Sequence, residues 1–202
     1  MIWSIDIFFK IRGLFIDFFS FLPSVLPPMS LHLFLGVVNL LYKILEKILQ
    51  IISFGTLKAD DWASSCYLVR DGHYGGELMF DGPSCHILLK NKSKLVSLLI
   101  QHDLIEQCQP WLDAFEALQD VIKSCFGKEL LPRYVNDIRA FADAFFNLMN
   151  FCNELNHNEL DRITLNVIPK VHAIFVHIKQ FINLQKETYN FDFGLGFYTE
   201  QP

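Results

Sequence analysis

Residues 111–125 read W-L-D-A-F-E-A-L-Q-D-V-I-K-S-C, and their apolar side chains return every three or four positions. This period places one apolar face along an α-helix. A second segment opens near Pro132 and repeats the pattern with Val135, Ile138, Phe141, Ala142, Phe145, Leu148, Met149 and Cys152. Gly127 suits the position just after a helix end. Because the connection is short, we predict an antiparallel helix hairpin within residues 104–156, as the strongest core of a mainly α-helical bundle.

A further helix of about 20 residues is predicted from Ser30, which suits an N-cap. Its apolar stripe is Leu33, Val37, Leu40, Leu41, Ile44 and Ile48, with Lys43, Glu46 and Lys47 opposite. Gly36, inside this helix, would let another helix approach closely. Residues 55–87 are rich in glycine and predict an irregular middle segment, after which a helix resumes at about His86.

Composition excludes several classes of protein. The chain has 202 residues, enough for one domain with a sizeable core, and its formal net charge of −5, without a basic run, gives no general signal for nucleic-acid binding. Its five cysteines are scattered and lack a C-x-x-C pair, which is typical of reduced intracellular thiols. The phosphate-binding loop, the H-E-x-x-H zinc motif and the G-x-S-x-G nucleophile motif do not occur.

The amino-terminal region leaves an alternative open. Residues 1–25 form an aromatic leader whose charged residues are placed wrongly for a signal peptide, and we expect it to lie outside the main domain. Residues 18–42 carry no Asp, Glu, Lys or Arg and are long enough to span a bilayer. Pro23, Pro27 and Pro28 interrupt the stretch, so a break is the first interpretation. The alternative is a membrane-associated protein, anchored through residues 1–55, with a helical soluble body.

The carboxy-terminal region carries the candidate site. Residues 167–182 read V-I-P-K-V-H-A-I-F-V-H-I-K-Q-F-I and predict an amphipathic helix that begins at Pro169. His172 and His177 have a spacing that zinc half-sites accept. Five residues of an ideal helix turn through about 500°, so the two imidazoles would point about 140° apart. They converge on one metal only if the helix begins or distorts near His172.

Several phrases in order resemble a known family. They are L-H-x-x-x-G-x-x-N-x-x-Y-K (31–43), Y-G-G-x-x-x-F-x-G-x-x-C-x-x-L-L-K-N (74–91), S-C-F-G-K-E-L-x-P-x-Y (124–134), the histidine pair, and G-L-G-F-Y-T-E-Q-P (194–202). Together they resemble the carboxy-terminal part of the catalytic core in Transib-type transposases and the related V(D)J recombinase catalytic subunit, in particular its uncharacterised transposon-derived branch. The resemblance covers about residues 26–202.

The resemblance implies roles for particular residues. His172 and His177 would help to bind structural zinc, and Gly194, Gly196, Tyr198 and Glu200 would form a turn close to the active site. Lys90, Lys92 and Lys94 would lie near DNA, the family's partner. In the family, three carboxylates hold Mg²⁺ or Mn²⁺ ions that cut and join DNA. The expected location is intracellular and nuclear, and a homodimer is conceivable.

The chain also departs from the family pattern. The first two catalytic aspartates and the cysteine pair of the zinc site belong to a part that would precede this segment, and the third carboxylate would follow Pro202. We therefore expect a transposable-element-derived helical domain, cut at both ends, with no catalytic residues and no enzymatic activity. Zinc binding is expected only with ligands from elsewhere. At 81–84 the chain reads Asp-Gly-Pro-Ser where relatives carry amide side chains, and an aspartate would repel phosphate.

Overall fold

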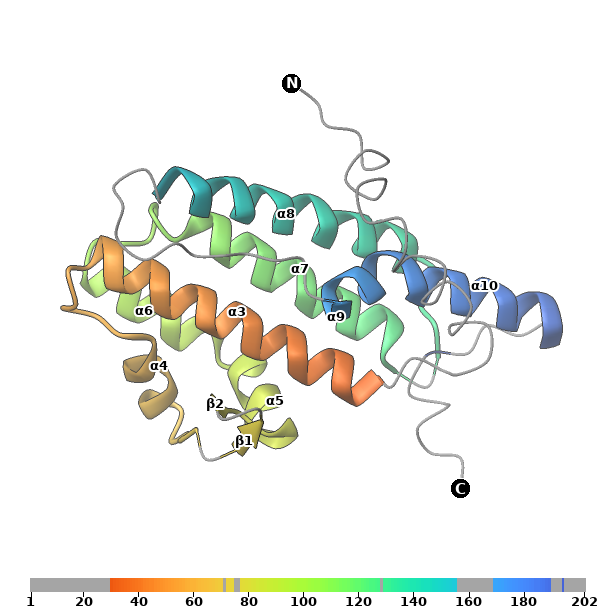
Figure 1. The fold of residues 1–202 in the computed structure, drawn as a ribbon, viewed down its shortest axis with the longest axis horizontal. Coiled ribbons are helices and arrows are strands. Elements are labelled where there is room, and N and C mark those ends of the chain that lie inside the picture. Colours follow the sequence, from red (N-terminus) through yellow and green to blue (C-terminus); the bar gives the residue numbers. More distant parts are fainter. Residues whose placement is uncertain are drawn as a thin grey trace.

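A computed structural model describes residues 30–70, 72–74, 77–127, 129–155, 169–189 and 194. These residues form a mainly α-helical bundle with one small sheet, which confirms the predicted fold class. Figure 1 shows α3 (Ser30–Ile52), α7 (Gln109–Cys125) and α8 (Tyr134–Leu155) running side by side. Residues 1–29, which include the predicted leader, lie outside the described part of the chain.

The predicted hairpin is formed by α7 and α8, which run antiparallel (Figure 1) and share the most extensive contact between any two elements of the described chain. Their facing side chains are those of the predicted stripes, and the buried ones are Trp111, Phe115, Leu118, Val121, Cys125, Ile138, Phe141, Phe145, Leu148 and Cys152. The connection closes on the end of α7, where the Leu131 N–H donates to the Ser124 carbonyl over 3.0 Å. The apolar period therefore predicted this part of the fold correctly.

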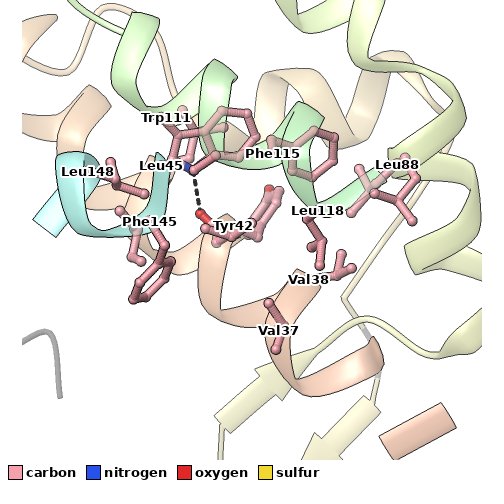
Figure 2. Packing of buried hydrophobic residues seen from close by; sticks show 14 of the residues in the cluster. Val37, Val38, Tyr42, Leu45, Leu88, Trp111, Phe115, Leu118, Phe145 and Leu148 are labelled. Atoms are coloured by element: carbon pink, nitrogen blue, oxygen red, sulfur yellow. Dashed lines mark hydrogen bonds between the residues drawn. The ribbon is translucent and has the colours of Figure 1, made fainter. Parts of the chain in front are cut away.

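Helix α3 is the second centre of the core. Six of its side chains have no exposed surface: Val37, Val38, Leu41, Leu45, Ile48 and Leu49. It packs against α4 (Ala59–Ser65), α5 (Gly82–Lys90), α7 and α9 (Pro169–His172). Figure 2 shows where it meets the hairpin: the indole N–H of Trp111 donates to the Leu41 carbonyl over 2.7 Å. The hairpin thus shares the core with α3.

Part of the segment predicted to be irregular is helical. Helix α4 lies within residues 55–87 and buries Trp62 completely. The Trp62 ring lies 6.0 Å from that of Trp111 and 5.7 Å from that of Phe115, both edge-to-face. At its start, the Lys58 N–H donates to the Asp61 carboxylate over 2.7 Å. The buried ring of Trp62 stabilises this helix, and so does the acidic Asp61 in its first turn. Together they outweigh the low helix preference of the glycine-rich surroundings.

The rest of the middle segment also differs from the prediction. Strands β1 (Gly72–Tyr74) and β2 (Glu77–Met79) pair antiparallel, and α5 begins at Gly82 instead of at about His86. Asp81 caps α5, because its Oδ1 accepts the Ser84 N–H over 2.8 Å, and hydrogen bonding to Ser84 lowers the pKa of its carboxyl group. Pro83 in the first turn suits this start.

The helix predicted to continue from His86 is broken at Asn91, between α5 and α6 (Lys92–Gln101). The Asn91 carbonyl accepts the indole N–H of Trp62 over 3.1 Å. Tertiary contact with α4 therefore accompanies the break.

Among the described residues, none of the helices is both long enough and apolar enough to cross a membrane. The described half of the uncharged stretch, residues 30–42, belongs to α3, and its apolar side chains from Leu33 onward pack in the core or against it.

Candidate metal site in the carboxy-terminal helix

The carboxy-terminal helix is continuous from Pro169 to Tyr189 but is not regular. It consists of α9, the π-helical turn η3 (Ala173–His177) and α10 (Ile178–Tyr189). Most of its predicted apolar stripe is buried, namely Val171, Ile174, Ile178, Phe181 and Ile182, and the remaining member, Phe175, is half-buried. Phe175 contacts the rings of Phe141 and Phe145 on α8, at centroid distances of 5.5 and 6.0 Å. The helix therefore docks on the hairpin through its irregular turn.

The π-turn brings the two predicted zinc ligands together. The ring centroids of His172 and His177 lie 4.9 Å apart, with the ring planes at 79°. In a π-turn the hydrogen bonds join residues five apart, so residues at that spacing lie above one another on one face. This is the distortion that the sequence required for the two rings to converge, and it falls between the two histidines.

The two ring nitrogens of His177 differ in their hydrogen bonding. Its Nδ1 lies 3.0 Å from Oε1 of Gln180, three residues further along α10. Its Nε2 is buried and makes no hydrogen bond to the described residues. Burial, followed by the neighbouring His177, lowers the pKa of His172. The neutral imidazole that this favours is the form that binds metals.

At this place the described residues supply only the two predicted ligands, His172 and His177. Within them, no group of three or more His, Cys, Asp or Glu side chains is placed to hold a metal ion. All five cysteines are buried free thiols. Burial raises the pKa of Cys85, Cys108 and Cys152 to about 12 and that of Cys125 to about 11, so these sulfurs stay protonated at neutral pH. At this place the described residues therefore bring together two histidine side chains, without a third candidate ligand.

The predicted carboxy-terminal turn is described at one residue. Gly194 packs its backbone on the connection between α7 and α8, where a Cβ atom would overlap the Gly127 carbonyl and approach the Glu129 carbonyl at 3.0 Å. Only glycine permits this approach. Gly196, Tyr198 and Glu200 lie outside the described residues.

The three predicted DNA-proximal lysines belong to two helices. Lys90 is the exposed last residue of α5. On α6, Lys92 Nζ pairs with Glu116 at 2.6 Å. Lys94 Nζ donates to the Ser65 carbonyl over 2.6 Å and lies 5.7 Å from the centre of the Tyr67 ring. Lys92 and Lys94 therefore have partners within the protein.

Residues of the phrase at 31–43 make structural contacts. Helix α9 packs on α3 as the close approach at Gly36 predicted, and the end of the Lys170 side chain occupies the space that a Cβ at Gly36 would fill. Asn39 is buried and binds the Phe80 backbone twice: its Oδ1 accepts the N–H over 2.8 Å and its Nδ2 donates to the carbonyl over 3.0 Å.

Tyr42, in the same phrase, donates to Asp60 over 2.7 Å, and burial together with this bond raises the pKa of its phenol. Arg70 lies over its ring and bridges to Glu46 and Asp60, each at 3.0 Å. These contacts hold the middle segment on α3.

Sequence reasoning missed Gln180 as a partner of His177. The signal for it was the spacing of three residues, which places two helical side chains side by side. Asn39 was also missed, and the signal there was a single amide within an apolar run.

Comparisons of the chain with protein-family models, with curated proteins and with solved structures give no match.

Proposed function

We propose that this chain is a non-catalytic helical domain of the Transib and V(D)J recombinase type, and that it supplies His172 and His177 as half of a structural zinc site. The observation that carries the proposal is the π-turn that brings the two imidazole rings to 4.9 Å. Two further ligands would come from a C-x-x-C segment, as in the family. The zinc would then join the helical domain to the part of a transposase that holds the catalytic aspartates.

The chemistry of the histidine pair supports the proposal. Zn²⁺ binds neutral imidazole nitrogen and is held by four ligands in structural sites. The buried Nε2 of His177, which has no hydrogen-bond partner among the described residues, fits a metal ligand. π-Turns are uncommon and occur often at functional sites. A turn that aligns two histidines therefore favours a metal-binding role over an ordinary place on an amphipathic helix.

The test uses the full chain, a synthetic C-x-x-C peptide and Co²⁺ as a spectroscopic substitute for zinc. We expect weak metal binding by the chain alone, because two ligands seldom hold a structural metal. With the peptide, we expect a tetrahedral cobalt spectrum with thiolate-to-metal charge transfer, at one metal per chain. His172→Ala and His177→Ala should each abolish the chain-dependent part of this spectrum.

His102→Ala is the control, because His102 is an exposed histidine at the end of α6. A spectrum identical with and without the chain would rule out the half-site. Stoichiometric zinc retained by the chain alone after dialysis would also contradict the proposal, since it would require a complete site.

The proposal further predicts no strand cleavage or strand joining by the purified chain with Mg²⁺ or Mn²⁺. Two-metal chemistry needs several carboxylates, and Glu200 is the acidic residue that matches the family's carboxy-terminal turn. Metal-dependent nicking of plasmid DNA that disappears in Glu200→Gln would overturn the non-catalytic assignment.

A further inference from the structure

We infer that Gln180 is a positioning residue for His177: it holds the proton on Nδ1 and so leaves Nε2 as the metal-binding nitrogen. This inference rests on the proposed zinc half-site. It adds that Nε2 of His177 is the atom that binds the metal, and that Gln180, which is not itself a ligand, orients the ring.

The hydrogen bond assigns the proton. A neutral imidazole carries one N–H, and the other nitrogen is an acceptor with a lone pair. The atom that faces Nδ1 of His177 is the amide oxygen Oε1 of Gln180, at 3.0 Å. A carbonyl oxygen only accepts, so Nδ1 is the donor. In the neutral imidazole, Nε2 then carries the lone pair. The same assignment gives a metal ion an available nitrogen.

Burial supports the same assignment. Nε2 of His177 has no access to solvent and no hydrogen-bond partner among the described residues. A metal ion would satisfy a lone pair at this position, whereas an N–H there would be a buried donor without an acceptor. The Nδ1–H tautomer is therefore the one that a bound metal completes.

The local helix geometry explains why Gln180 is the partner. His177 is the last residue of the π-turn, and Gln180 lies in the first turn of α10, where the regular period resumes. Side chains three apart on a regular helix are neighbours. The π-turn therefore joins His172 to His177 on one side, and the α-turn after it joins His177 to Gln180. An outer partner of this kind fixes the ring and its tautomer in metal sites.

The first measurement needs no metal. Long-range proton–nitrogen correlation NMR on the full chain, with labelled histidine, reports which ring nitrogen of His177 carries the proton. We expect the Nδ1–H tautomer in the wild type and in Gln180→Glu, and a mixture of both tautomers in Gln180→Leu. Lys179→Leu is the matched control, because Lys179 is the exposed neighbour on the same helix, and it should leave the tautomer unchanged.

The second measurement is Zn²⁺ affinity by competition with a chelating dye, in the presence of the C-x-x-C peptide. Loss of an outer partner weakens metal binding by about 10–100-fold, which is the loss expected in Gln180→Leu. Gln180→Glu should restore the affinity, since a carboxylate also accepts from Nδ1–H. Because Gln180 is exposed, equal thermal unfolding of all variants shows that the fold is intact.

The outcomes separate the inference from the proposed function. An Nε2–H tautomer in the wild type, or unchanged zinc affinity in Gln180→Leu, would overturn the role of Gln180 while leaving the histidine half-site standing. The expected tautomer in a chain that never binds zinc, even with the peptide, would remove the half-site but keep the assignment of the proton.

Discussion

The α7–α8 hairpin and the carboxy-terminal helix are both amphipathic, yet they use their polar atoms differently. In the hairpin, the period is regular and Cys125 and Cys152 are buried as protonated thiols. In the carboxy-terminal helix, one π-turn interrupts the period and brings two histidines together. The regular hairpin buries its sulfur atoms, whereas the π-turn both packs Phe175 on α8 and brings two imidazole rings together. The difference locates the candidate site.

The largest effect on the free energy of unfolding is expected from a substitution in the hairpin. Phe141 is fully buried and contacts Phe145 and Phe175. Phe141→Ala should lower the free energy of unfolding by about 3–5 kcal/mol, because it removes buried apolar surface and leaves a cavity. The measurement is chemical denaturation with a two-state fit.

Phe54→Ala is the control, since that side chain is 92% exposed, and its effect should stay within about 0.5 kcal/mol. A loss below 1 kcal/mol in Phe141→Ala, on the scale of large-to-small core changes, would contradict a hairpin-based core.

The next effect concerns the attachment of the middle segment to α3. Asn39→Leu removes both hydrogen bonds to the Phe80 backbone. Each buried group left without a partner destabilises the fold by about 1–3 kcal/mol. Hydrogen exchange should also show faster opening around β2 and α5 while the hairpin keeps its protection. Uniform loss of protection over the whole chain would show that Asn39 belongs to the common core instead.

A smaller effect concerns the pH dependence of stability that the buried thiol of Cys152 contributes. Burial raises the pKa of Cys152 from 9.0 to about 12. The folded state therefore holds the thiol proton more tightly than the unfolded state. This contribution to stability is complete below about pH 9 and is lost as the pH rises toward about 12.

Denaturation curves at neutral pH and near pH 10.5 should accordingly show a fall in unfolding free energy that is smaller in Cys152→Val. Iodoacetamide should label the five cysteines slowly in the folded chain and quickly in denaturant. Rapid labelling of the native protein would show that the thiols are not sequestered.

The smallest effect is expected from removing the irregularity itself. Deleting Val176 would turn the spacing of five residues into four, which on a regular α-helix also places both histidines on one face. We expect a regular helix with zinc affinity close to that of the wild type in the peptide-assisted assay. Loss of binding as large as in His177→Ala would show that the π-turn contributes more than alignment.

The sequence predicted the regular parts of the fold well. The stripes of α3, α7 and α8 follow from side-chain period alone, and the structure buries most of the residues that were named. The prediction failed where a single contact outweighs local preference. Helix α4 forms in a glycine-rich stretch because Trp62 enters the core, and Asp81 proved to be a helix cap.

For the candidate site, the sequence determined the ligand types and their spacing but left their geometry open. An ideal helix would have separated His172 and His177. The π-turn that brings them together forms where Phe175 packs against Phe141 and Phe145 on α8. The same holds for Gly194, whose contact with Gly127 joins residues far apart in the chain. Local period is encoded within a few residues, so the sequence alone determined it. The π-turn and the glycine contact depend on which distant surfaces meet, and the tertiary structure decided them.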